Sequence, residues 1–112
     1  MHEASITDGL VKILLSEANR HEVCAVKKVT IKVGKLQAVE PQALRFCFEM
    51  FVENTIAEGA ELVIDHLAAV ARCKSCLHEF EVFNFQFKCT CCACKDLELL
   101  QGEELFIDSF EV

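Results

Sequence analysis

The sequence predicts a small α+β protein in which two helices pack on a three-stranded sheet and a four-cysteine module is inserted between strands. Three observations predict this fold. Apolar residues recur at spacings of three and four in two segments, as in amphipathic helices. They alternate with polar residues in other segments, as in half-buried strands. Between two of those segments lies the pattern Cys-x2-Cys-x12-Cys-x2-Cys, formed by Cys73, Cys76, Cys89 and Cys92.

The first helix is expected over residues 4–21 and is followed by a strand over residues 26–33. The apolar stripe of this helix consists of Ile6, Leu10, Ile13, Leu14 and Ala18. In the strand, Val29, Ile31 and Val33 alternate with polar residues, which predicts one buried and one open face. Gly34 marks the end of the strand.

The second helix is expected to begin at Glu40-Pro41, because proline is favoured in the first turn of a helix, where its missing N–H is not needed. Its apolar stripe consists of Leu44, Cys47, Phe48, Phe51 and Val52. Cys47 lies on that stripe, so we expect it to pack in the core as a small apolar side chain. After Gly59 a strand is predicted with Leu62, Ile64, Ala68 and Val70 on one face.

The cysteine module precedes two further strands, over residues 97–100 and 104–112, with a turn at Gln101-Gly102. We expect the last strand to return to the N-terminal sheet. The module would then be an insertion with residues 71–96 as one domain and residues 1–70 with 97–112 as the other.

Charge and apolar content limit the classes of function. The formal net charge is −7, from 11 Lys and Arg against 18 Asp and Glu. Nucleic-acid binding needs a basic face, so it is not expected. Neither a secretory signal nor an apolar run long enough to cross a membrane is recognisable, which predicts a cytoplasmic protein without a membrane segment. In a reducing compartment, eight cysteines favour a metal over disulfides.

Two Cys-x2-Cys turns can surround one tetrahedral ion, and four thiolates leave no open position, so the spacing predicts a structural zinc site. Cys73 and Cys76 form the first pair. The second half contains two overlapping pairs, Cys89/Cys92 and Cys91/Cys94, and the spacing leaves both open.

The amino terminus offers a different donor set. In Met1-His2-Glu3 the α-amine, the amide nitrogen of His2 and its ring nitrogen can take three corners of a square plane. Planar coordination by nitrogen suits Ni(II) or Cu(II). A histidine at the second position also occurs by chance, so this signal is weak by itself.

A set of short motifs occurs in order along the chain. It consists of Met1-His2-Glu3, Val33-Gly34, Val39-Glu40-Pro41, Phe46-Cys47-Phe48-Glu49, Glu58-Gly59-Ala60, the two Cys-x2-Cys pairs, Gly102-Glu103-Glu104-Leu105 and Phe110-Glu111-Val112. Together they closely resemble the HypA/HybF family of hydrogenase nickel-insertion proteins, over essentially the whole chain.

The resemblance implies a cytosolic nickel metallochaperone and not an enzyme. It implies a nickel site at His2, with Met1 and Glu3 contributing main-chain nitrogens and with Glu40 as an additional ligand in some members. The alternative for Glu40 is a carboxylate that stabilises a helix start. Implied partners are the HypB GTPase and the large subunit of [NiFe]-hydrogenase, with urease as a client in some organisms, and the implied state is a monomer or weak homodimer.

The resemblance also bears on the zinc ligands. The family pattern has a leucine five residues and a glycine ten residues after the last ligand. Counting from Cys92 reaches Leu97 and Gly102, whereas counting from Cys94 reaches Leu99 and Glu104. We therefore predict Cys73, Cys76, Cys89 and Cys92 as ligands, with Cys91 and Cys94 as the alternative second pair. This chain departs from the family in having Thr90 where a proline is usual and in the two extra cysteines.

Two other functions remain as alternatives. One is a zinc-ribbon accessory or interaction module, against which the acidic net charge argues. The other is a thiol redox protein that uses Cys73/Cys76 or Cys91/Cys94.

Overall fold

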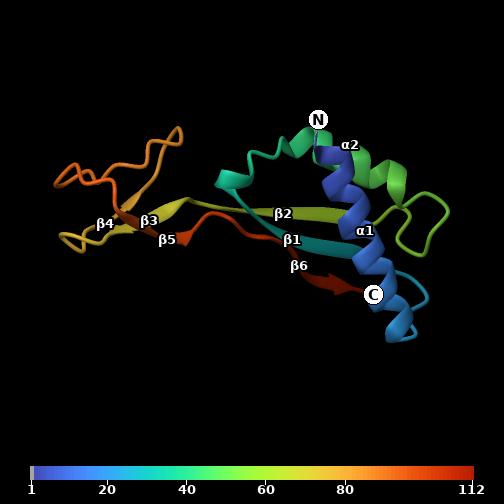
Figure 1. The fold of residues 1–112 in the computed structure, drawn as a ribbon. Helices are drawn as coiled ribbons and strands as arrows, with labels where there is room; N and C mark the ends of the chain where they lie inside the picture. The colour runs from blue at the N-terminus through green and yellow to red at the C-terminus, as the bar shows by residue number, and fades with distance from the viewer. Residues whose placement is uncertain (1) are drawn as a thin grey trace. The chain divides into compact units, whose positions relative to one another are not determined.

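The computed structural model describes residues 2–112 (Figure 1). In chain order its elements are α1 (Glu3–Arg20), β1 (Lys28–Gly34), the 3-10 helix η1 (Lys35–Gln37), α2 (Pro41–Phe51), β2 (Glu61–Leu67), β3 (Val70–Cys73), β4 (Glu79–Glu81), β5 (Leu97–Gln101) and β6 (Leu105–Glu111). None of the helices among these residues is long and apolar enough to cross a membrane.

The chain forms two compact units. The first contains residues up to Lys32, Val39–Asp65 and Phe106–Val112, and the second contains Val33–Ala38 and His66–Leu105. The sequence predicted a nickel-binding domain of residues 1–70 with 97–112 and a zinc-binding module of residues 71–96. The two compact units describe how the backbone is grouped in space and not where metals bind, so this division into metal-binding domains stays a prediction.

The first unit is built on a sheet of strand order β2-β1-β6. Strands β1 and β2 run in the same direction and are joined by α2, whereas β6 runs in the opposite direction (Figure 1). The backbone N–H of Lys27 donates to Glu111 at 2.8 Å, which places the end of β6 beside the start of β1. The predicted return of the last strand to the N-terminal sheet is therefore confirmed.

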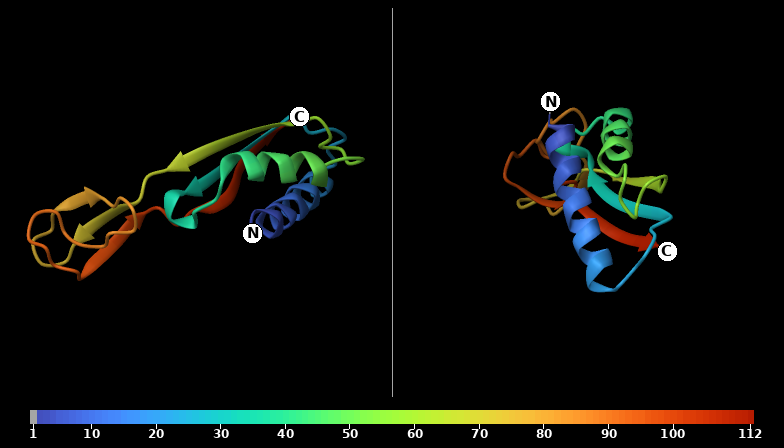
Figure 2. Two further views of the ribbon diagram at one scale, coloured as in Figure 1. Left: turned by 90° about the horizontal axis from the view of Figure 1, so that it is seen from above. Right: turned by 90° about the vertical axis from the view of Figure 1, so that its right-hand side faces the viewer.

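Both helices pack on the same face of this sheet, because side chains of α1, α2 and all three strands surround one small cavity of about 10 Å³. In β1, Val29, Ile31 and Val33 are buried, as the alternation predicts. Two views of the ribbon show α1 and α2 beside the strands (Figure 2). The predicted arrangement of two helices on a three-stranded sheet is confirmed.

The buried face of α1 differs from the predicted stripe. The side chains that are buried on this helix are those of Glu3, Thr7, Val11, Leu14 and Ala18. Ile13, expected in the core, is 57% exposed. The stripe is rotated because Glu3 and Thr7 find hydrogen-bond partners at the start of the helix, so polar residues can occupy the buried face there.

The apolar stripe of α2 is largely as predicted. Leu44, Cys47 and Phe48 are buried in the helix, and the predicted core position of Cys47 is confirmed. Phe51, also expected there, is only partly covered, at 36% exposure. Pro41 occupies the first turn, as expected, and Glu40 is the N-cap.

The second unit contains an antiparallel sheet of order β4-β3-β5. One predicted strand running from Leu62 to Val70 is wrong, since the segment forms β2 and β3, which belong to different sheets and are separated by Ala68 and Ala69. The buried core of this unit consists of Ala69, Ala71, Cys73, Phe80, Val82 and Cys89. So small a core contains few large side chains and contributes little to the free energy of folding. A bound metal ion is one way to stabilise such a unit.

Two glycines meet in this unit where the chain leaves β1 and where it leaves β5. A Cβ on Gly34 would lie 1.9 Å from the carbonyl oxygen of Gly102, and Gly102 itself has a φ of +132°. The backbone N–H of Leu36 donates to the same Gly102 carbonyl at 2.9 Å. Only residues without a side chain allow so close an approach of two backbone segments.

Candidate metal centres

The four predicted cysteine ligands come together in the second unit. Among residues 2–112, Cys73, Cys76, Cys89 and Cys92 form the one group of three or more potential metal-binding side chains, with all four Sγ atoms within 4.8 Å of one another. Cys73 Sγ lies 3.5 Å from Cys92 Sγ, and Cys76 Sγ lies 3.6 Å from Cys89 Sγ. Sulfurs bound to one tetrahedral Zn²⁺ at about 2.3 Å would lie about 3.8 Å apart, so the donor set fits that ion.

The two halves of the cluster have the same backbone geometry. After Cys73, the N–H of Leu77 donates to the Cys73 carbonyl at 2.9 Å, and after Cys89 the N–H of Ala93 donates to the Cys89 carbonyl at 3.0 Å. Leu77 and Ala93 both have positive φ, 65° and 64°. The equivalent position after Cys91 would be Lys95, which does not share this conformation. Cys89 therefore begins the same type of turn as Cys73, and Cys91 does not.

Backbone N–H groups point at the first sulfur of each pair. Cys76 N–H donates to Cys73 Sγ at 3.5 Å, and Cys91 N–H and Cys92 N–H donate to Cys89 Sγ at 3.3 Å and 3.4 Å. The N–H of Cys92 is the main reason that the pKa of Cys89 is lowered to about 6. The N–H of Cys76 likewise lowers the pKa of Cys73.

The second cysteine of each pair, Cys76 or Cys92, has a raised pKa instead. The backbone N–H of His78 favours the thiolate of Cys76, but burial and the neighbouring thiols of Cys89 and Cys92 together raise its pKa to about 12. The backbone of Cys94 favours the thiolate of Cys92, yet the Cys73 sulfur and burial give a raised pKa. Without a cation the cluster thus resists holding four negative charges, and a divalent ion would remove that cost.

The two extra cysteines lie outside the cluster. Cys91 is exposed. Cys94 Sγ lies 3.3 Å from Ser75 Oγ and accepts the N–H of Asp96 at 3.4 Å. Ligation by the predicted set rather than by Cys91 and Cys94 stays a prediction, and the shared turn geometry favours it.

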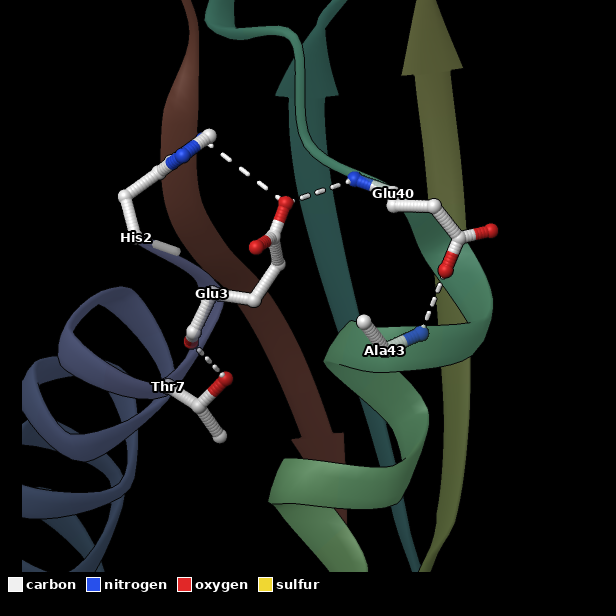
Figure 3. Close-up of polar contacts among 5 residues, drawn as sticks. All are labelled: His2, Glu3, Thr7, Glu40 and Ala43. Carbon is white, nitrogen blue, oxygen red and sulfur yellow. Dashed lines mark hydrogen bonds and ion pairs between the residues drawn. The ribbon is translucent and has the colours of Figure 1, made fainter.

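The second candidate centre lies where α1 and α2 begin (Figure 3). Met1 falls outside the described residues, so its predicted role cannot be placed. His2 is the N-cap of α1, and its carbonyl accepts the N–H of Ile6 at 3.0 Å. The His2 side chain is half exposed, and its Nε2 lies 3.8 Å from Glu3 Oε2.

Glu3 joins the two helix starts. Its side chain is 7% exposed, and Oε2 accepts the backbone N–H of Glu40 at 3.1 Å. Its carbonyl accepts the hydroxyl of Thr7 at 2.6 Å. The N–H of Glu40 is the largest of the influences that lower the pKa of Glu3, so this carboxylate is ionised at neutral pH.

Glu40 is the N-cap of α2, and its Oε2 accepts the N–H of Ala43 at 2.6 Å. The alternative interpretation of Glu40 as a helix-start carboxylate therefore describes the structure, while nickel ligation stays a prediction. Sequence reasoning assigned Glu3 only a main-chain nitrogen and missed its side-chain contact. A signal for it was present, because Glu3 and Thr7 continue the spacing of Val11, Leu14 and Ala18.

A domain of two helices on a three-stranded sheet, combined with a four-thiol cluster that could hold a metal, defines a small α+β metal-binding protein. The family model described as hydrogenase/urease nickel incorporation, metallochaperone, HypA matches residues 1–112. The chain therefore belongs to the HypA family. Members of this family are metallochaperones and maturation factors, not catalytic enzymes, which confirms that prediction.

Individual relatives agree with this assignment. The chain is 42% identical to the hydrogenase maturation factor HypA of Caldanaerobacter subterraneus subsp. tengcongensis, over 100% of this chain and 99% of the relative. It is 39% identical to HypA of Desulfitobacterium hafniense strain DCB-2, over 100% of this chain and 98% of the relative. The solution structure of the Ni metallochaperone HypA from Helicobacter pylori superposes with a TM-score of 0.71 at 26% identity, covering 99% of this chain and 97% of that one.

Proposed function

We propose that this chain binds Ni(II) at its amino terminus and delivers it for maturation of [NiFe]-hydrogenase. The observation that carries the proposal is the meeting of His2, Glu3 and Glu40 at the starts of α1 and α2 (Figure 3). The family description names urease beside hydrogenase, so urease is included as a second client.

The proposed nickel ligands are the ring of His2 and main-chain nitrogens of Met1 and Glu3, with Glu40 as an additional oxygen ligand. Glu3 is the first residue of α1. The N–H groups of a first helical turn have no acceptor within the helix, so the Glu3 nitrogen is not needed for helix formation. Nitrogen donors in a plane are the coordination that Ni(II) prefers.

The electrostatics of this site support transient binding. The amino ends of two helices carry partial positive charge, which disfavours a cation. The carboxylates of Glu3 and Glu40 offset that charge but are each already engaged by a backbone N–H. The helix ends repel the ion while the carboxylates attract it, which favours weak binding. Weak binding suits a protein that must release its metal.

Zn(II) is proposed as a structural ion on Cys73, Cys76, Cys89 and Cys92. When bound, zinc would cross-link the turn after β3 to the loop before β5 and add free energy of folding to a unit with a small apolar core. All four positions around the ion would be filled by sulfur, so no reactive position is left.

The proposed partners are the HypB GTPase, which would act with this chain in nickel delivery, and the large subunit of the hydrogenase. We also propose that the chain acts in the cytoplasm as a monomer or weak homodimer. Phe83, Phe85 and Phe87 are exposed in the second unit, whereas Phe80 is buried, so the segment of residues 80–87 contributes to both a core and an outer surface. Exposed aromatic side chains in one loop support a partner-facing role for this unit.

Nickel titration by calorimetry of the zinc-loaded protein tests the nickel site. We expect His2→Ala, and separately a Gly-Ser extension before Met1, each to abolish nickel binding at the amino-terminal site. His66→Ala is the control, because His66 is exposed on β2 and belongs to no cluster among the described residues. Unchanged nickel binding in both altered forms would show that the site lies elsewhere.

A further inference from the structure

The outward side of α2 carries large apolar side chains that the fold leaves uncovered. Phe46 is 63% exposed and Met50 is 48% exposed. They are four residues apart, so they lie on the same side of the helix, opposite the buried Leu44 and Phe48. In the right-hand view of Figure 2, α2 (green) lies above the strands, and no element of its unit covers its far side.

Acidic side chains lie on this side of the helix and just beyond its end. Glu49 falls three positions after Phe46 in α2, and Glu53 lies two residues past the last helical residue; both are exposed. Neither side chain forms an ion pair or hydrogen bond with another residue of the described range 2–112, whereas Asp8, Glu17 and Glu79 are paired with basic side chains. The outward stripe of α2 is thus apolar, with unneutralised negative charge on it at Glu49 and just past its end at Glu53.

A surface hollow of about 530 Å³ begins beside Glu49 and extends past the end of the helix. It is lined by Glu49, Val52, Glu53, Asn54, Glu58, Gly59 and Ala60. Glu58 holds the rim in shape, because its Oε1 accepts the backbone N–H of Asn54 at 2.7 Å. Both acidic residues, Glu49 and Glu53, therefore line a hollow to which Glu58 adds a third carboxylate.

We propose that the surface formed by Phe46, Glu49, Met50 and Glu53, the α2 outer face, docks a basic amphipathic helix of a partner protein. The negative charge selects the class of partner. Nucleic acid and anionic membranes would be repelled, and a second copy packed symmetrically on the same face would oppose carboxylate to carboxylate. Apolar groups four residues apart match the spacing of apolar groups on a facing helix, and lysine or arginine beside them would pair with Glu49 and Glu53.

Chemical-shift mapping with a defined probe tests this surface. The probe is a synthetic 18-residue helix with leucines on one face, at spacings of three and four, and lysines at the flanking positions. It is added to the ¹⁵N-labelled, zinc-loaded full chain. We expect shifts concentrated on residues 42–60 and weaker binding as salt is raised, since added ions screen the carboxylates.

Matched variants make the test decisive. Phe46→Ser with Met50→Ser should weaken peptide binding at least about tenfold, because exposed side chains that anchor a partner contribute most of the affinity. Glu49→Gln with Glu53→Gln should weaken it and flatten its salt dependence. Ile13→Ser, which removes an equally exposed apolar side chain from α1, should leave binding unchanged.

Several results would overturn the proposal. If a peptide with glutamate in place of lysine binds equally well, charge does not select the partner. Shifts centred on Phe83, Phe85 and Phe87 would place apolar docking on the other unit. Self-association of the chain that disappears in the Phe46→Ser, Met50→Ser variant would identify a second copy as the occupant. None of these readouts depends on nickel, so they are independent of the nickel site.

Discussion

The carboxylate of Glu3 accepts the backbone N–H of Glu40 at 3.1 Å across 37 positions of sequence. The first residue of α1 is thereby tied to the N-cap of α2. His2 is the residue before Glu3 in the chain. The position of the His2 ring therefore depends on the hydrogen bond between the Glu3 carboxylate and the Glu40 N–H. Glu3 acts here as a positioning residue for the proposed nickel site.

Removing the Glu3 side chain is expected to weaken nickel binding without removing any proposed ligand atom. Glu3→Ala should reduce nickel affinity about 10- to 100-fold, the range typical for residues that orient metal ligands. Glu3→Gln keeps an oxygen that can accept the Glu40 N–H, so it should lose less. Calorimetric nickel titration of the three proteins distinguishes these cases, and equal affinity in all three would contradict a positioning role.

The ionisation of Glu3 predicts a pH dependence of stability. The pKa of Glu3 in the folded chain is lowered from its usual value of 4.5, chiefly by the Glu40 N–H. The folded state therefore favours the carboxylate, and this stabilisation is present above the unfolded value and is lost as pH falls through the folded pKa.

Thermal unfolding of wild type and Glu3→Gln at pH 7 and below pH 4 measures this effect. The melting-temperature difference between the two proteins should be largest at pH 7 and should shrink in acid. Comparing two proteins cancels the loss of zinc in acid, which affects both. A difference that grows as the pH falls would have the wrong sign.

Cysteine substitutions should separate the two possible second pairs. Cys92→Ser removes a sulfur that lies 3.5 Å from Cys73 Sγ and should lose tightly held zinc. Cys91→Ser and Cys94→Ser should each retain one zinc per chain, since neither side chain belongs to the cluster. Metal analysis after dialysis against a weak chelator gives the zinc content, and the reverse pattern would shift the ligand set to Cys91 and Cys94.

A single methyl group added where Gly34 contacts Gly102 should destabilise the folded chain. Gly34→Ala places a Cβ 1.9 Å from the Gly102 carbonyl oxygen, a clash with backbone that cannot rotate away. We expect a loss of at least about 1–3 kcal/mol in the free energy of unfolding. Gly9→Ala is the matched control, because a Cβ there meets nothing within 4 Å. In a helix, that change should stabilise by about 0.5–1 kcal/mol. Urea unfolding measures both.

Much of this fold could be predicted because its signals are local. The alternation in β1, the proline that begins α2 and the spacing of the cysteine pairs each depend on residues a few positions apart. The last strand was also expected to return to the N-terminal sheet, and the structure agrees. The split of the predicted Leu62–Val70 strand was missed, because Ala68 and Ala69 continue the apolar pattern while the chain passes from one sheet to another.

Local patterns were sufficient to predict two amphipathic helices, short strands and a module of four thiols that can surround a tetrahedral ion, since periodicity and turn spacing follow from local backbone geometry. The buried face of α1, the turn geometry that Cys73 and Cys89 share and the contact between Glu3 and Glu40 became clear only from the three-dimensional fold. Those outcomes depend on contacts between segments far apart in the chain, where a hydrogen-bond partner makes burial of a carboxylate favourable. The spacing of Glu3 and Thr7 with Val11 indicates this face of α1, but the backbone N–H that makes burial of Glu3 favourable lies 37 positions away, at Glu40.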